Sequence, residues 1–226
     1  MAKTYQYYDI SLPLNQMVRV LPDMKLPPNL KPPPSNPPSS VYRIQDVNKG
    51  DPVTMARLEL ISHDGTHIDA PLHFIPGGTT IDAMPIETAN GPCRVIEIKD
   101  EKDITIKEIE PYNIKAGERI LFKTKNSPHV YDVRQYTGPY VAITPATADY
   151  LVAKKIRIVG LDYLTIGHMD PPDDINKVHR AFLGNGIYIL EAINLDGVPA
   201  GEYELMCLPL RIENGDAGPC RVILRK

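Results

Sequence analysis

The sequence predicts an α+β fold with a β-barrel or β-sandwich core and few helices. Nine short segments are rich in β-branched residues and end at Gly, Pro, Asn or Asp, which is typical of strands. Only three segments carry helix signals, and each is short. The 226 residues suit a single domain spanning 1–226 and are enough to bury a large core.

The predicted strands are spread over the whole chain. Turn-forming residues separate them, so each strand is expected to be short. In chain order they are Tyr5–Ile10, Met55–Ile61, Cys93–Ile98, Arg119–Thr124, Val141–Thr144, Arg157–Asp162, Ile187–Glu191, Tyr203–Leu208 and Cys220–Leu224.

Local capping patterns predict three helices. Residues Thr105–Glu108 have the form of a capping box and open a short helix that ends near Pro111. Thr144 is an N-cap before a proline at the first helical position, leading into ATADYLVAKK. Asn176 is expected to cap the third helix, KVHRAFL, and Gly184 to supply its left-handed C-terminal stop.

Residues 21–40 form a proline-rich segment, LPDMKLPPNLKPPPSNPPSS. Proline fixes φ and removes the backbone donor, which excludes helix and central strand here and predicts an extended, polyproline-like arm. Two interpretations stay open: a surface loop or linker, and an arm that packs on a neighbouring subunit or over a site. A PxxP ligand is the least favoured, because nothing else in the chain resembles a signalling protein.

Charge and composition exclude several classes of protein. With 25 Lys+Arg, 28 Asp+Glu and a net charge of -3, the chain lacks the basic excess of a nucleic-acid-binding module. No apolar run approaches the roughly 18 residues of a membrane span, and the opening MAKTYQYY lacks a signal peptide's apolar region. Three cysteines without CxxC spacing suggest neither a disulfide framework nor a cysteine zinc site. We therefore expect a cytoplasmic protein that binds neither nucleic acid nor membrane.

The segment Ser62–Phe74, SHDGTHIDAPLHF, is the part of the sequence that carries chemistry. Three of the six histidines and two aspartates fall within it. Gly65 and Pro71 argue against a helix, so we expect a strand that ends near Ser62 and then a tight glycine turn. A catalytic triad built from the consecutive residues 62–64 is rejected, because neighbouring side chains cannot point into one relay.

Such a turn can bring His63 and His67 toward one point, with Asp69 completing a set of two imidazoles and one carboxylate. Zn(II), Mn(II) and Fe(II) accept these ligands, and three protein ligands leave positions open for water. The HxxxHxDxxxH spacing, which ends at His73, favours metal binding over a polar turn whose histidines cap strands.

A second candidate group lies far along the chain. His179 is expected near the start of the third helix, and Glu191 ends the strand GIYILE. An acid that follows such an apolar strand needs a partner or a metal if it is buried. Taken alone, His179 is better explained as a helix-end histidine and Glu191 as a strand-end glutamate facing water, and a metal-binding role for them gains support only from the first cluster.

The run from His63 to Phe74 resembles the signature of the metal-dependent cyclase family, which includes bacterial kynurenine formamidase and isatin hydrolase. Weaker similarities extend over most of the chain, at Tyr8–Leu14, Gly160–Asp162 and the region from His179 to Tyr203. One stretch departs from the family: where members commonly carry Tyr/Trp-Pro-Gly-Asp after the opening strand, this chain reads MVRVLPDM.

The resemblance implies a swivelling β/β/α fold with a β-barrel-like core, assembled as a homodimer or homotetramer. It also implies site roles. His63, His67 and Asp69 would bind one divalent ion, Zn(2+) or Mn(2+), and Asp69 would bridge to a second ion held by His179 and Glu191. His73 would be the catalytic base.

The expected activity is hydrolysis of an amide in a small-molecule substrate, either an aryl formamide such as N-formylkynurenine or a cyclic amide. Metal-activated water would attack, and His73 would pass its proton to the leaving nitrogen. Three alternatives stay open: a hydrolase acting on an ester or lactone, a non-catalytic metal-dependent binding protein of the same fold, and, least favoured, a cupin-like metal oxygenase.

Overall fold

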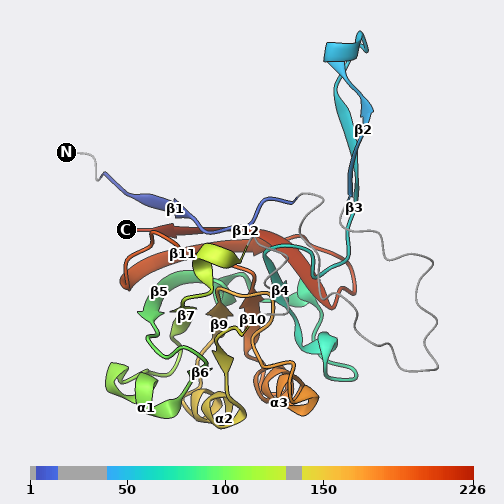
Figure 1. Ribbon diagram of the computed structural model, residues 1–226. Helices are drawn as coiled ribbons and strands as arrows, with labels where there is room; N and C mark the ends of the chain where they lie inside the picture. The colour runs from blue at the N-terminus through green and yellow to red at the C-terminus, as the bar shows by residue number, and fades with distance from the viewer. Residues whose placement is uncertain (1–3, 15–39, 131–138) are drawn as a thin grey trace.

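The computed structural model describes residues 4–14, 40–130 and 139–226, and its core is a closed β-barrel (Figure 1). Seven strands follow one another in the order β12-β11-β5-β7-β9-β10-β4, and β4 pairs back with β12. Strand β1 adds to the outer side of β12. The predicted α+β class with a barrel-like core is confirmed, while the proline-rich segment lies almost entirely outside the described residues.

Each of the nine predicted strands is present, with ends that differ by a few residues. Two short pairs, β2 with β3 and β6 with β8, lie apart from the barrel sheet. The strands are β1 (Tyr7–Asp9), β2 (Ser40–Gln45), β3 (Met55–Glu59), β4 (His67–Asp69), β5 (Asn90–Glu97), β6 (Asp103–Ile104), β7 (Arg119–Lys123), β8 (Ala142–Ile143), β9 (Ile158–Leu161), β10 (Tyr188–Glu191), β11 (Gly201–Pro209) and β12 (Ala217–Arg225).

Three α-helices cover one side of the barrel (Figure 1): α1 (Ile106–Ile109), α2 (Pro145–Ala153) and α3 (Pro172–Leu183). Short 3-10 turns occupy the connections, among them η2 (Pro71–His73), which carries a predicted site residue. No helix in the described part of the chain has the length and apolarity needed to cross a membrane.

The parallel strands β5, β7, β9 and β10 separate two hydrophobic cores. On β7, Leu121 belongs to the core inside the barrel, whereas Ile120 and Phe122 belong to the core under the helices. On β9, Ile158 faces inward and Val159 faces the helices. Burial on both faces explains why β7, β9 and β10 are nearly continuous apolar runs.

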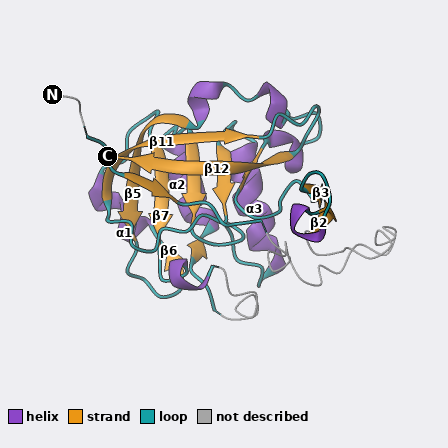
Figure 2. Cartoon of the chain, turned by 90° about the horizontal axis from the view of Figure 1, so that it is seen from above, coloured by secondary structure: helices purple, strands orange, loops and turns teal. Residues whose placement is uncertain are grey.

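Strand β12 closes the barrel because it pairs with both β4 and β11, while β1 also pairs with its last residues. Its first residues, Ala217 to Pro219, pair with β4, and Cys220 onward pairs with β11. Seen from above, β11 and β12 run across the direction of β5 and β7 (Figure 2), in keeping with the strand tilt that closure requires.

Two of the predicted helix ends are wrong. Helix α3 begins at Pro172, so Asn176 lies inside it and does not cap it. Pro171 occupies the N-cap position, because the following proline already has the φ of a first helical residue. Gly184 keeps right-handed backbone angles, and the left-handed residue of this turn is Gly186, with φ +70°.

The cap of α1 also differs from the prediction. Thr105 makes no side-chain capping bond, and Glu108 instead accepts hydrogen bonds from the backbone N–H groups of Lys99 and Asp100. At α2 the prediction is confirmed: Thr144 Oγ1 accepts from the Thr147 N–H, with Pro145 at the first helical position.

This difference gives a test of the two caps. Replacing Thr144 by Ala removes a side-chain acceptor from a helix N-terminus and is expected to lower the free energy of unfolding by about 1 kcal/mol. Thr105→Ala removes no such bond, so its effect is expected within about 0.5 kcal/mol. Urea denaturation of both variants measures this, and equal losses would show that the capping bond at Thr144 contributes nothing.

Candidate metal centre

The candidate metal centre lies outside the barrel wall, between strands β4 and β10 and helix α3. On β4, Ile68 points into the barrel core, so His67 and Asp69 share the opposite face. Strand β10 is antiparallel to β4, and Glu191 lies directly across from His67. Helix α3 supplies His179 from the third side. The barrel closure therefore determines which side chains meet here.

Four of these side chains are almost completely buried: Asp69 is 0% exposed, His67 and His179 2%, and Glu191 4%. His67 Nε2 lies 3.3 Å from Asp69 Oδ1 and 3.4 Å from Glu191 Oε2. His179 Nε2 lies 3.7 Å from Asp69 Oδ2 and 3.4 Å from Glu191 Oε1. Two imidazoles and two carboxylates thus converge on one small, buried volume.

Backbone carbonyls determine how the two buried rings are protonated. His67 Nδ1 lies 2.8 Å from the Gly65 carbonyl oxygen, and His179 Nδ1 lies 2.8 Å from that of Ile175. A carbonyl only accepts, so both rings donate through Nδ1–H and turn Nε2 toward the carboxylates. Such outer hydrogen bonds are typical of metal-binding histidines.

Some of the polar atoms that face the centre of this cluster make no hydrogen bond. Among the described residues, His67 Nε2 and both carboxylate oxygens of Asp69 are buried and lack a hydrogen-bond partner. A buried unpaired carboxylate is costly, and a lone pair on Nε2 beside carboxylate oxygens is repulsive. A divalent cation removes both penalties, because carboxylate oxygen and neutral imidazole are its ligands. The residues present fit a divalent metal.

His63 enters the centre from the loop before β4. Its Nδ1 lies 2.9 Å from Asp69 Oδ1, on the side of Asp69 that also faces His67. Gly65 has φ +65°, and the Asp64 carboxylate accepts from the Ile61 N–H, so a tight turn places His63 here. The predicted glycine turn is confirmed, but His67 and Asp69 belong to strand β4 that follows it.

These contacts shift the ionisation of the buried groups. Burial lowers the pKa of His63, but the charge of Asp69 and the hydrogen bond to Asp216 outweigh it and raise the pKa to about 9. Burial raises the pKa of Asp69, yet the nearby imidazoles of His63 and His67 hold it well below its usual range. The centre is thus arranged to keep Asp69 ionised.

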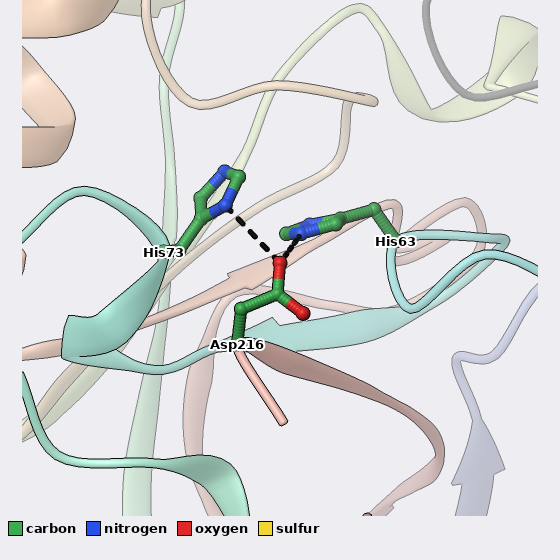
Figure 3. Close-up of side chains that lie close together, drawn as sticks. All are labelled: His63, His73 and Asp216. Atoms are coloured by element: carbon green, nitrogen blue, oxygen red, sulfur yellow. Dashed lines mark hydrogen bonds and ion pairs between the residues drawn. The ribbon is translucent and has the colours of Figure 1, made fainter. Parts of the chain in front are cut away.

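Asp216 connects His63 with His73 (Figure 3). One oxygen, Oδ2, lies 2.9 Å from His63 Nε2 and 3.5 Å from His73 Nδ1. The other, Oδ1, accepts from Ser62 Oγ at 2.9 Å. Hydrogen bonds from His63 and His73 lower the pKa of Asp216 despite its partial burial. Asp216 therefore links the inner ligands to the rim.

His73 lies at the rim, on η2. Its side chain is 28% exposed, against 15% for His63 and 2% for His67, so it is accessible to solvent. The His63 and His73 rings are tilted by 40° with centroids 4.1 Å apart. Among the histidines of the centre, His73 is the one placed to exchange protons with water.

The structure brings every sequence-predicted site residue to this region, although His179 lies seven positions after the helix's first residue, not near its start. Sequence reasoning missed Asp216. It stands alone before strand β12, without histidine or acid at ligand spacing, and only the pairing of β12 with β4 places it beside the cluster.

Comparison with known proteins identifies the family. A family model described as "Putative cyclase" matches residues 8–168, well over half of the chain. The chain belongs to the cyclase family. The match confirms the resemblance seen in the segment from His63 to Phe74, whereas His179, Glu191 and Asp216 lie beyond the matched residues.

Solved structures extend the similarity to the C-terminal region. A predicted metal-dependent hydrolase from Bacillus stearothermophilus is 30% identical, with 99% of each chain covered and a TM-score of 0.78. Isatin hydrolase A from Labrenzia aggregata, bound to benzyl benzoate, is 26% identical, covering 98% of this chain and 93% of that one at a TM-score of 0.78. An isatin hydrolase bound to the product analogue thioisatinate is 25% identical. The match covers 98% of this chain and 92% of that chain, with a TM-score of 0.81. The fold is therefore that of metal-dependent hydrolases.

Metal binding is expected to stabilise the protein, because the centre joins β4, β10 and α3. At a free metal concentration 100-fold above Kd, binding adds about 2.7 kcal/mol. Adding Zn(2+) or Mn(2+) to chelated protein should therefore raise the melting temperature, as measured by scanning calorimetry.

Asp69→Asn should remove most of this stabilisation and reduce the bound metal measured by elemental analysis. The exposed Glu202→Gln is a matched control for the loss of one carboxylate and should behave as wild type. Full metal loading of Asp69→Asn would contradict the assignment of Asp69 to the centre.

Proposed function

We propose that this protein is a metal-dependent amidohydrolase that cleaves a cyclic amide or an aryl formamide such as N-formylkynurenine. The observation that carries the proposal is the pairing of a buried, metal-suited donor set with a solvent-accessible His73 joined to it through Asp216. The two isatin hydrolases described above are similar to this chain, and isatin is a cyclic amide, which supports this substrate class.

Two groups of ligands are proposed around Asp69. His63 and His67 face Oδ1, and His179 faces Oδ2, with Glu191 beside His67 and His179. His63, His67 and Asp69 would therefore hold one divalent ion, and Asp69, His179 and Glu191 would hold a second. When bound, Zn(2+) or Mn(2+) would supply a Lewis acid for the amide carbonyl and lower the pKa of a water ligand from 15.7 toward about 7.

His73 is proposed as the general base and then the general acid. Asp216 holds the Nδ1 side of the ring, which leaves Nε2 free to take a proton from the attacking water. The same Nε2–H then donates to the amide nitrogen as the C–N bond breaks. Because His73 is partly exposed, its ring can exchange protons with solvent between turnovers.

A panel of lactams, formanilides and aryl esters, tested with added Zn(2+) or Mn(2+), is the direct experiment. Hydrolysis of the amides supports the proposal. Turnover of the esters alone would favour the second candidate class, an ester or lactone hydrolase, for which the benzyl benzoate bound to one isatin hydrolase is an argument. Tight metal-dependent binding without any turnover would favour the non-catalytic binding protein.

His73→Ala is expected to lower kcat by about 10² to 10⁴ while the bound metal stays at the wild-type level, because His73 moves a proton and is not assigned as a ligand. Elemental analysis and steady-state kinetics measure both quantities. His129→Ala, an exposed histidine on η6 (Ser127–His129), is the matched control and should retain full activity. Wild-type turnover by His73→Ala would show that the base lies elsewhere.

Asp216→Asn is expected to lower kcat by about 10- to 100-fold, the usual effect of losing a group that orients ligands or catalytic histidines. If Asp216 acts through His73, the double variant His73→Ala/Asp216→Asn should be no slower than His73→Ala. Single- and double-variant kinetics form a mutant cycle. If the fold-loss in kcat of the double variant equals the product of the two single-variant losses, Asp216 and His73 act independently.

A further inference from the structure

One phenyl ring, that of Phe74, contacts both the ligand His179 and the proposed base His73. It stacks on the His179 imidazole, with centroids 4.5 Å apart and an angle of 23° between the planes. It meets the His73 imidazole edge-on, with centroids 4.7 Å apart and an angle of 86°. The two imidazole centroids are 6.0 Å apart. The side chain of Phe74 therefore joins two groups to which the metal centre and the proton transfer give different tasks.

The orientation of His179 needs this second contact. Its hydrogen bond from Nδ1 to the Ile175 carbonyl fixes one atom of the ring. The ring can still tilt about that atom, and a tilt would move Nε2, which lies 3.4 Å from Glu191 Oε1. A planar ring stacked on one face of the imidazole opposes this tilt. Phe74 therefore fixes the plane of His179, while Ile175 fixes the edge at which the ring is held.

Ring contacts also position His73. Its Nδ1 lies 3.5 Å from Asp216 Oδ2 (Figure 3), longer than the roughly 3.2 Å limit of a normal hydrogen bond between nitrogen and oxygen. The rings of His63 and Phe74 both pack against the His73 imidazole. The long polar contact therefore leaves much of the positioning of His73 to its aromatic neighbours.

Phe74 is itself fixed from two elements. Its backbone N–H donates to the Pro71 carbonyl, which holds it at the end of η2. From α3, Arg180 Nη1 donates to the Phe74 carbonyl oxygen at 3.3 Å, and the guanidinium lies over the ring, 5.8 Å from its centroid. The side chain also packs against the core under the helices. These contacts join η2, which carries His73, to α3, which carries His179.

We propose that Phe74 is a positioning residue that fixes the plane of His179 for metal binding and the location of His73 for proton transfer. A phenyl ring moves no proton and is not a ligand of a divalent cation, so Phe74 acts only through the two histidines. The part that concerns His73 rests on the proposed function, whereas the part that concerns His179 rests on metal binding alone.

Space-filling is the competing explanation, and the two make different demands on the side chain. Filling the space between η2 and α3 needs apolar bulk, which leucine supplies. Fixing the plane of an imidazole needs a flat ring, which tyrosine supplies and leucine does not. Phe74→Leu and Phe74→Tyr therefore separate positioning from packing.

The first measurement is the Zn(2+) affinity of the full-length protein, by competition with a chromogenic chelator. Phe74→Leu is expected to weaken Zn(2+) binding about 10- to 100-fold, the usual effect of losing a group that orients a metal ligand. Phe74→Tyr should bind Zn(2+) as the wild type does. The control is Phe122→Leu, which removes a completely buried phenyl ring on β7 and should lower the melting temperature without weakening Zn(2+) binding.

The second measurement needs neither metal nor turnover. In the NMR spectrum of the chelated protein, the ring current of Phe74 should shift the carbon-bound ring protons of His179 upfield. This shift should be lost in Phe74→Leu and kept in Phe74→Tyr. In steady-state kinetics, Phe74→Leu should lower kcat about 10- to 100-fold with little change in KM, because Phe74 acts on the histidines and is not assigned a substrate contact.

Wild-type Zn(2+) affinity and an unchanged His179 spectrum in Phe74→Leu would overturn the proposal. Equal losses in Phe74→Leu and Phe74→Tyr, or an equal loss in Phe122→Leu, would show that packing alone matters and would also overturn it. If none of the amides is hydrolysed, the proposed function fails, while Zn(2+) affinity and the His179 spectrum still decide whether Phe74 positions the ligand.

Discussion

The charge of one carboxylate dominates the architecture of the site. Asp69 is completely buried, its oxygens accept no hydrogen bond, and three imidazoles surround it. Such a group is stable only if a positive charge lies beside it, supplied by protonated histidines or by a metal ion. Since carbonyls hold the Nδ1 protons of His67 and His179, their Nε2 atoms face Asp69 in the orientation that metal coordination requires.

The barrel and the metal centre depend on the same short strand. Strand β4 has three residues, yet it closes the barrel by pairing with β10 and β12. The register puts Ile68 in the barrel core and His67 and Asp69 outside it, and a shift by one residue would exchange them. The same register of β4 therefore closes the barrel and positions the site residues. A cation that links β4, β10 and α3 would stabilise both.

Local signals predict the strands well and the long-range contacts poorly. Apolar runs between turn residues predict β7, β9 and β10, because burial on both faces leaves a clear pattern. The clustered histidines likewise predict the centre. Asp216 and the partners of Glu191 depend on which strands become neighbours, and a local pattern does not contain that information. The start of α3 was missed because a proline at its first turn outweighed Asn176 as a boundary signal.

The boundary between the β2–β3 hairpin and the rigid body falls immediately before the site. Strand β3 ends at Glu59, four residues before His63, yet Asp64 and Thr66 are buried. Thr66 Oγ1 accepts from the Leu12 N–H and donates to the Ala192 carbonyl, which anchors the turn to the barrel. His63 is thus positioned by hydrogen bonds of its own turn and of Asp216, whereas the hairpin strands β2 and β3 pair only with each other among the described residues.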